Sequence, residues 1–489
     1  MFHLSRRTKL LLCAFPAVVP LLTAGGCQGT TLTVTTTVDE LNNDGDCSLR
    51  EAARASNLDA PVDACPAGNG ADTIALGVGT YRLTVVGQRE QEGLAGDLDF
   101  LDSVTINGAG SGATIIDGNG TERIIDVFAP ASVTINDLTI RNGLPAPGRR
   151  GGAIVVLDGS SLALNRTTVE GNATADGPDR IPDGGGIYND GTMVIVDSTI
   201  RDNTAGGNEG SGGGIWNSGN LTLTRSTVSG NHANGSDSVT FAIDGGGGIY
   251  NAGTLNLTTS TISANTANYR AGGVGNTGTA TVSRSTFDGN VGLSGGAIHA
   301  TSTLTVTNST LSGNSARSSG GGVWSSTTQA TLASLTVAGN VADSDQNGSG
   351  DGGGLAVGTG GTVFARNTLL AGNADRGGEA PDCRTSGALQ SQGYNRFGSL
   401  VGCVVSGDTT GNQVGAASLL GPLAANGGPN RTRALLEGSP AIDAANPGAP
   451  GGGGSTCPTT DQRAVARPQD GNNDSVARCD IGAYERVPD

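Results

Sequence analysis

The sequence predicts an all-β protein, a right-handed parallel β-helix in which about 11–13 coils stack into a solenoid. Three observations predict it. A residue register recurs along the chain, in units as short as 24 or 25 residues. Gly accounts for 83 of 489 residues and aromatic residues for only 3%. Short runs alternate apolar and β-branched residues without a helical period, which is typical of strands. One such coil cannot bury its apolar face alone, so stacking is expected.

Each unit begins with a Gly run and an apolar residue, and an Asn follows 16 to 18 residues later. The apolar residues are Ile154, Ile187, Ile215, Ile249, Val274, Ile298, Val323 and Leu355. The asparagines are Asn172, Asn203, Asn231, Asn265, Asn290, Asn314, Asn340 and Asn373. Stacked strands place equivalent residues about 4.8 Å apart. We therefore expect the asparagines to form an internal ladder at a turn.

The Gly runs, such as residues 184–186, raise the alternative of a phosphate-binding loop. That loop needs a helix directly after the glycines, and every copy here is followed by a strand pattern. The glycines are instead predicted to form a tight corner of each coil. Weaker strand-and-turn patterns continue toward the N-terminus, so we expect the solenoid over residues 72–400.

The N-terminus has the pattern of a signal peptide over residues 1–26. Arg6, Arg7 and Lys9 precede an apolar stretch that is short for a membrane span. Ala24-Gly-Gly-Cys27 is similar to a lipoprotein cleavage site, which would place a lipid on Cys27, with ordinary secretion as the alternative. Either path predicts an exported protein, at the cell surface, in the outer membrane or outside the cell.

The net charge excludes some partner classes. It is −16, and becomes −19 without residues 1–26, which carry three basic and no acidic side chains. An acidic surface without basic clusters argues against nucleic acid and against direct binding to an anionic membrane. Membrane attachment is expected only through a lipid anchor, and the protein is expected to be a monomer.

Six cysteines remain beyond Cys13 and Cys27, and they fall into three local couples. The couples are Cys47 with Cys65, Cys383 with Cys403, and Cys457 with Cys479. Export makes disulfides plausible, but six cysteines allow fifteen pairings, so this connectivity rests on proximity alone. A metal site is the weaker alternative, because no C-x-x-C motif occurs and the three His lie far from these cysteines.

A solenoid needs caps, because its ends expose an open core and unpaired strands. Ser48 and Glu51 have capping-box spacing, which predicts a short helix in an N-terminal cap over residues 27–71. A second cap that contains disulfides is expected over residues 401–489.

Asp44-Gly-Asp-Cys-Ser-Leu-Arg-Glu-Ala52 resembles the CSLREA region of bacterial surface proteins. Other motifs resemble the choice-of-anchor Q domain, namely Asn426-Gly-Gly-Pro, Gly438-Ser-Pro-Ala-Ile-Asp, Asp461-Gln-Arg, Arg467-Pro and Cys479-Asp-Ile-Gly-Ala-Tyr-Glu. The repeats are similar to polymorphic outer-membrane-protein repeats of the pectin-lyase-like β-helix class. The resemblance implies a surface-attached protein and no particular activity. Such chains often continue into a sorting segment, whereas this one ends at Arg486-Val-Pro-Asp, so a lipid on Cys27 would replace that anchor.

The longest consecutive insertions lie at one corner, over residues 173–186, 204–214 and 232–248. Beside them, the residues that follow the apolar markers are aromatic and are expected to face outward. Loops on a rigid scaffold often carry function, so this edge is the predicted ligand site. Its candidate residues are Tyr188, Trp216, Tyr250, Asp183, Arg180, His232 and Asp244. A polysaccharide or another cell-surface ligand would suit it, and the alternative is that the rings only stack on each other.

Asp343, Asp345, Asn347 and Asp351 have the spacing of a calcium-binding loop. Gly354 stands where an EF-hand needs Glu, so only an isolated Ca²⁺ loop is predicted, with a solvated acidic turn as the alternative. Ca²⁺ is the one candidate cofactor.

No catalytic residues are predicted. Hydrolysis needs two carboxylates within one or two coils on one face, and although Asp183 and Asp244 lie two coils apart, Asp244 is offset by one residue and Ser211 intervenes. The predicted function is therefore non-catalytic binding or adhesion at the cell surface. A polysaccharide lyase or glycoside hydrolase is the first alternative, and a structural envelope component is the second.

Overall fold

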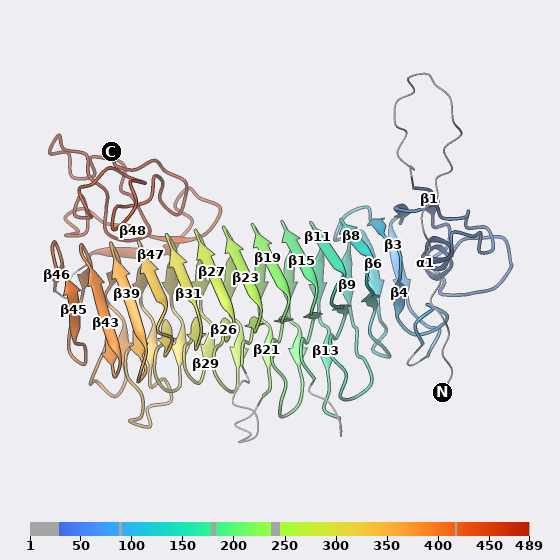
Figure 1. The fold of residues 1–489 in the computed structure, drawn as a ribbon, viewed down its shortest axis with the longest axis horizontal. Helices are drawn as coiled ribbons and strands as arrows, with labels where there is room; N and C mark the ends of the chain where they lie inside the picture. Colours follow the sequence, from blue (N-terminus) through green and yellow to red (C-terminus); the bar gives the residue numbers. More distant parts are fainter. Residues whose placement is uncertain (1–28, 88–89, 178–181, 236–244, 416–417, 489) are drawn as a thin grey trace, which may run out of the picture.

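The computed structural model describes residues 29–87, 90–177, 182–235, 245–415 and 418–488. Their strands build a parallel β-helix with three long sheets of 14, 13 and 11 strands and a fourth of eight (Figure 1). The predicted all-β solenoid and its number of coils are confirmed.

One coil illustrates the architecture. It consists of β18 (Ile215–Asn217), β19 (Asn220–Thr224), β20 (Thr227–Ser229) and β21 (His232–Ala233). Each strand pairs in parallel with the same strand of the next coil, so that Ile215 lies beside Ile249. These inward side chains are fully buried, and the same holds for their counterparts in neighbouring coils. The apolar core therefore runs continuously along the axis.

The 11-stranded sheet carries the features discussed below. Its strands are β4 (Leu98–Phe100), β7 (Ile125–Val127), β10 (Ile154–Val156), β14 (Ile187–Asn189), β18, β22 (Ile249–Asn251), β26 (Val274–Asn276), β30 (Ile298–Ala300), β34 (Val323–Ser325), β38 (Leu355–Val357) and β42 (Cys383–Thr385). All pairings are parallel, and equivalent residues therefore form columns along the solenoid.

The predicted asparagine ladder is present, and all eight members are buried. Nδ2 of Asn203 donates to Oδ1 of Asn231 at 2.9 Å, and the backbone N–H of Asn203 donates to the same oxygen at 3.0 Å. Asn231 repeats both kinds of bond with Asn265. A second ladder, which the repeat register did not predict, joins the side chains of Asn189, Asn217, Asn251 and Asn276.

The Gly runs form the predicted corner. Gly212 has φ of +65°, in the left-handed region that favours glycine. A Cβ on the next residue, Gly213, would lie 2.4 Å from the carbonyl oxygen of His232. The positive φ of Gly212 and the close backbone approach at Gly213 both require glycine at the corner, and strand β18 follows it directly. The structure thus supports the corner over the phosphate-binding loop.

The N-terminal cap contains the predicted helix, α1 (Leu49–Leu58), and Ser48 and Glu51 make both bonds of the capping box. Arg50 on this helix is fully buried and forms an ion pair of 2.6 Å with Asp39. The cap also adds β1 (Thr31–Thr33) in parallel to β2 (Asp72–Ala75). Figure 1 shows α1 laid against the first coils.

Parallel pairing extends beyond the expected limits 72–400. β1 precedes them, and β45 (Val405–Asp408) and β46 (Gln413–Val414) follow them at the far end of two sheets. These end strands pair with their neighbours through the parallel backbone ladder, but they lack the Gly run and the ladder Asn of the regular units. The repeat register could therefore not reveal them.

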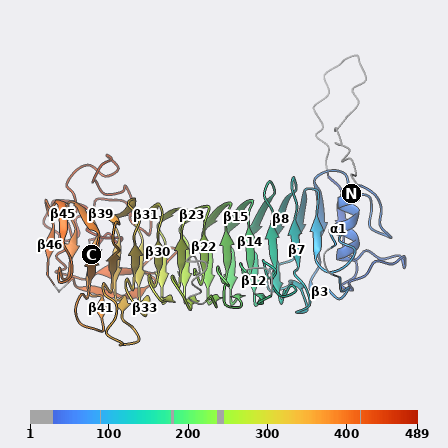
Figure 2. The same cartoon turned by 60° about the horizontal axis from the view of Figure 1, so that its bottom comes forward.

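Residues 418–488 form a lobe that folds back along the side of the solenoid (Figures 1 and 2). It includes the antiparallel pair β47 (Leu420–Ala424) and β48 (Thr432–Leu435). Nε2 of Gln462 donates to the hydroxyl of Thr286 at 2.8 Å, and the hydroxyl of Thr310 donates to Oε1 of Gln462 at 2.6 Å. The predicted cap thus lies against a lateral face, because its polar side chains bond to the Thr column of the 13-stranded sheet.

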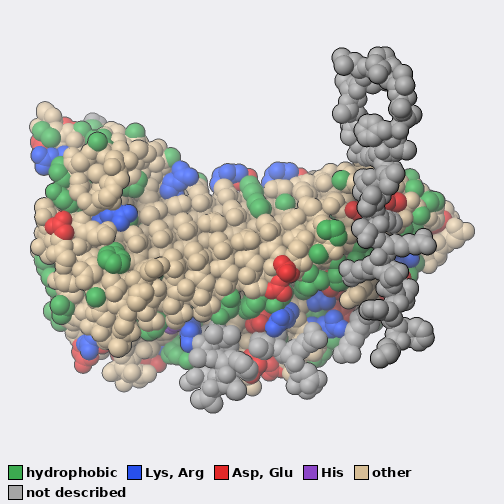
Figure 3. All heavy atoms as spheres, viewed as in Figure 1, with side chains coloured by type: hydrophobic (Ala, Val, Ile, Leu, Met, Phe, Trp, Pro, Cys, Tyr) green, Lys and Arg blue, Asp and Glu red, His purple; other side chains and the backbone are tan. Residues whose placement is uncertain are grey.

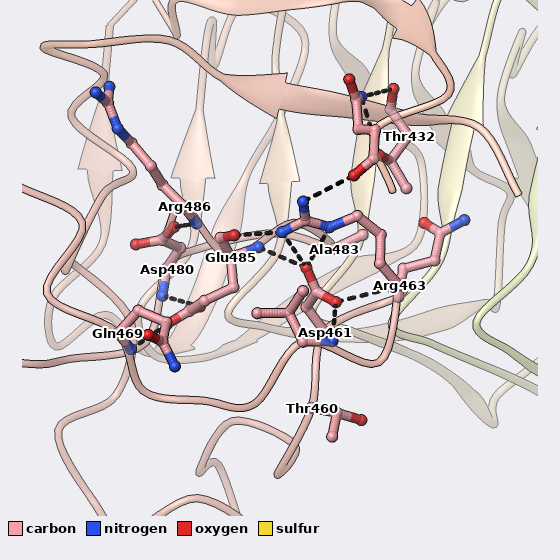
Figure 4. Close-up of polar contacts among 12 residues, drawn as sticks. Thr432, Thr460, Asp461, Arg463, Gln469, Asp480, Ala483, Glu485 and Arg486 are labelled. Atoms are coloured by element: carbon pink, nitrogen blue, oxygen red, sulfur yellow. Dashed lines mark hydrogen bonds and ion pairs between the residues drawn. The ribbon is translucent and has the colours of Figure 1, made fainter. Parts of the chain in front are cut away.

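A buried polar network holds this C-terminal lobe together (Figure 4). Oδ1 of Asp461 accepts the backbone N–H of Arg463 at 2.8 Å, and Oδ2 accepts the N–H of Glu485 at 3.0 Å. Asp480 and Glu485 are fully buried, and both contact Arg467 through its side chain. Asp461, Arg467, Asp480 and Glu485, which belong to the motifs quoted in the sequence analysis, therefore lie in the interior of the lobe.

All three predicted disulfides are present, with Cα–Cα distances of 4.9, 5.7 and 6.5 Å for Cys47–Cys65, Cys383–Cys403 and Cys457–Cys479. Within the described residues, no helix has both the length and the apolar character that a membrane crossing needs.

The lateral face in Figure 3 carries few charged side chains, and those present gather along its upper and lower edges.

Candidate functional site

A pocket of about 710 Å³ opens over the N-terminal part of the 11-stranded sheet. We call it the acid pocket. Its floor comes from β7, β10 and β14, and its walls come from Glu90 and Gln91 and from residues 146–150. Its lining residues are Glu90, Gln91, Asp97, Glu122, Arg123, Asp126, Phe128, Ala146, Pro147, Gly148, Arg149, Arg150, Val155, Leu157, Tyr188 and Asp190.

One column of the sheet links this pocket to the predicted aromatic residues. Asp99 is the register partner of Asp126, and Asp126 is the partner of Val155. The column then continues through Tyr188, Trp216 and Tyr250. The sheet therefore places two carboxylates in adjacent coils, directly in line with three stacked rings.

The carboxylates of Asp97, Asp99 and Asp126 form a compact cluster, with one oxygen of each lying within 4.8 Å of the others. All three residues are at least 92% buried. Arg123 pairs with Asp97 at 3.2 Å and also with Asp126. Oδ2 of Asp99 accepts the N–H of Gly93 at 2.9 Å, whereas its Oδ1 has no hydrogen-bond partner in the described part of the chain.

Burial raises the pKa of two of these carboxyls. The pKa of Asp99 rises to about 8, first because of burial and then because of the charges of Asp97 and Asp126. Burial also raises the pKa of Asp126 to about 7, and the neighbouring Arg123 limits that rise. Asp99 and Asp126 therefore resist holding two negative charges at once unless a cation joins them.

The aromatic column is a stack. The ring centroids of Tyr188 and Trp216 are 4.4 Å apart with planes at 7°, and those of Trp216 and Tyr250 are 6.0 Å apart at 23°. Tyr188 and Tyr250 are buried, contrary to the expectation that all three would face solvent, because neighbouring coils cover the ring faces. Trp216 stays partly exposed.

Arg150 connects this stack to the acid pocket. Its guanidinium lies 4.8 Å from the Tyr188 ring centroid, and Nη1 donates to the Tyr188 hydroxyl at 2.6 Å. Asp183, which was predicted at this edge, is buried 3.9 Å from Arg150. The structure therefore brings Asp183, Tyr188 and Trp216 together around one arginine.

Other predicted ligand residues lie apart from this group. His232 begins β21 in the eight-stranded sheet and does not line the acid pocket. Arg180 and Asp244 lie outside the described residues, and so does Cys27. Their proposed roles stay predictions.

In the loop over residues 343–351, the carboxylates contact N–H groups of the same loop and one arginine outside it. Asp343 is buried, and its oxygens accept the N–H groups of Asn347 at 3.0 Å and Gly348 at 3.2 Å. Asp345 accepts from the Asn347 amide, and Asp351 lies 3.4 Å from Arg384. Among the described residues, the groups of three acidic side chains whose oxygens lie within 4.8 Å of one another do not include this loop. Calcium binding by this loop and its alternative, a solvated acidic turn, both stay predictions.

The geometry of the acid cluster limits its chemistry. Glycosidases hold their two carboxyl groups about 5–5.5 Å apart when retaining and about 6.5–9.5 Å apart when inverting. The oxygens of Asp99 and Asp126 come within 4.8 Å, and Asp99 is only 1% exposed. A sugar in the pocket would therefore not fit between these two groups.

Sequence reasoning missed the acid cluster, although a signal exists. The regular unit at Ile154-Val-Val has two apolar residues, one on either side of one outward position. The same pattern occurs in Leu98-Asp-Phe and Ile125-Asp-Val, with Asp at the outward position. Both triplets precede the eight regular units, which begin at Ile154. An alignment of these triplets would have brought Asp99 and Asp126 into register.

Comparisons with known proteins add little beyond the fold. No protein-family model matches the sequence, and no curated protein matches it. The fold is similar to the crystal structure of pectate lyase Pel9A, with a TM-score of 0.45 and 14% identity over 95% of this chain and 98% of that chain. The resemblance to CSLREA and choice-of-anchor Q proteins therefore stays a prediction.

Proposed function

We propose that this chain is an exported β-helix protein, held at the cell surface by a lipid, that binds a glycan in the acid pocket without cleaving it. The observation that carries the proposal is the pocket itself. Its volume of about 710 Å³ lies in the usual range for ligand sites, and it combines charged groups with the apolar side chains of Phe128, Val155 and Leu157.

The exposed groups of the pocket suit sugar hydroxyls. Gln91 is exposed, and Arg149 and Arg150 are partly exposed at the rim, where they offer several N–H donors. Trp216 extends the apolar side of this rim next to Tyr188. Aromatic rings with one polar tip commonly supply binding surface of this kind.

The charges of the lining favour a glycan with little negative charge. Among the described residues, five carboxylates line the pocket, from Glu90, Asp97, Glu122, Asp126 and Asp190, against three arginines. A densely anionic polysaccharide would be repelled by this excess. A neutral glycan or one with amino sugars fits better.

Cleavage is the second candidate, because Asp97 and Asp126 reach the pocket lining beside Arg123. Electrophoresis of the purified chain through gels that contain neutral, amino or acidic polysaccharides tests both. We expect neutral or amino glycans to slow the protein and to keep their chain length. Shortened glycan would favour a lyase or hydrolase.

Arg150→Ala should weaken binding about tenfold or more, because it removes several donors from the rim. Asn256→Ala is the matched control, since Asn256 is exposed on another sheet. Equal retardation of both variants would exclude the acid pocket as the binding site.

A further inference from the structure

The acid cluster of Asp97, Asp99 and Asp126 carries a charge that its partners among the described residues do not balance. In the portion of the chain that the structure describes, these three carboxylates share one directly paired cation, Arg123. When ionised, this group keeps two negative charges, and the charge of Glu90 also acts on Asp99. Buried charges need a partner, because water solvates them poorly in such a place.

Oδ1 of Asp99 gives a second observation. The residue is only 1% exposed, and this oxygen has no hydrogen-bond partner among the described residues, while Oδ2 is held by the N–H of Gly93. Buried carboxylate oxygens are almost always paired. An oxygen that is buried in a cluster of carboxylates and lacks a donor indicates a missing ligand.

The dimensions of the cluster suit calcium. Ca²⁺ takes six to eight oxygen ligands at about 2.3–2.6 Å, so two ligands on opposite sides lie about 5 Å apart. One oxygen of each carboxylate lies within 4.8 Å of the other two. Asp97 and Asp126 also line the acid pocket, from which an ion could enter and water could complete its shell.

We propose that Asp97, Asp99 and Asp126 bind one calcium ion beneath the acid pocket, where it neutralises the cluster and fixes the first coils. The ion would lock β4 to β7, because Asp99 and Asp126 lie on these adjacent strands. The proposal is independent of glycan binding, and it differs from the calcium site predicted at residues 343–351.

Calorimetric titration and thermal unfolding of the metal-stripped full chain test this proposal. CaCl₂ should bind at the cluster and raise Tm by about 2–3 °C at a hundredfold excess over Kd. Asp99→Asn should abolish that rise and should fold, because its side-chain oxygen can still accept from Gly93. Asp97→Asn serves as a second variant with the same expected loss.

The double variant D343N/D345N is the matched control, and it should keep the calcium response. If it loses the response while Asp99→Asn keeps it, the loop is the site and the proposal is wrong. No calcium response in the wild-type chain, together with a Tm that rises as pH falls toward 5, would identify a shared proton in place of the ion. Because the experiment contains no glycan, a negative result for calcium would not contradict the proposed glycan binding.

Discussion

The rings of Tyr188 and Trp216 lie almost parallel, with centroids 4.4 Å apart and planes at 7°. They come from adjacent coils, 28 residues apart, and the parallel register of β14 and β18 sets their positions. Trp216 lies between two tyrosines and so couples three coils.

Trp216→Ala should lower the free energy of unfolding by about 2–4 kcal/mol, because it removes a large, partly buried ring and two stacking contacts. Chemical denaturation followed by circular dichroism measures this. Trp216→Phe keeps a ring in the stack and should lose less than half as much. Equal losses for both variants would show that the stack itself contributes little.

Asn231→Ala should cost about 3 kcal/mol or more. It removes the oxygen that accepts two bonds from Asn203 and leaves those donors buried and unpaired. The exposed Asn256→Ala, from the neighbouring coil, should change stability by less than about 0.5 kcal/mol. Comparable effects at both positions would mean that the ladder is not a stabilising element.

His299 predicts a pH effect. It is buried and stacked on Trp324 at 4.2 Å, and burial, followed by the charge of Arg270, lowers its pKa to about 3. The unfolded chain binds this proton from about pH 6.5 downward, whereas the folded chain does so only near pH 3. The stability contributed by neutral His299 should therefore be lost as pH falls from about 6.5 to 3.

His299→Phe keeps an aromatic ring in the stack without a titrating group. As pH falls from about 6.5 to 3, the wild-type chain should therefore lose unfolding free energy relative to this variant. A difference that does not change with pH would contradict the assigned pKa shift.

Gln462→Ala should loosen the C-terminal lobe, since the Gln462 amide bonds to Ser285, Thr286 and Thr310 in two coils. Limited proteolysis should release residues 418–488 faster from this variant. Gln469→Ala, whose side chain makes an exposed bond within the lobe, should be cut at the wild-type rate. Unchanged cleavage of Gln462→Ala would mean that other contacts hold the lobe.

The sequence predicted those parts of the molecule that repeat. Equivalent positions such as Ile215 and Ile249 reveal the register, and the register determines which strands pair and where the asparagines align. The helix α1 was predictable as well, because Ser48 and Glu51 make a local cap. The disulfides followed from short separations of 18 to 22 residues.

The acid pocket and the position of the C-terminal lobe could not be predicted in the same way. Asp99 aligns with the regular units only through its short apolar–Asp–apolar triplet, whereas Arg123 and the loop residues at the walls of the pocket belong to no repeated pattern. Gln462 meets Ser285 across 177 residues without a repeated pattern at either end. Such contacts depend on how loops and a non-repeating lobe pack, which local propensity does not encode.

The fold-back of the C-terminal lobe has a consequence for cooperativity. Its polar contacts reach from Ser260 to Asn367, on five successive coils. A solenoid otherwise couples only neighbouring coils, so it can open locally from an end. The lobe should join those five coils into one unit whose amide hydrogens exchange together, while the coils nearer α1 exchange independently.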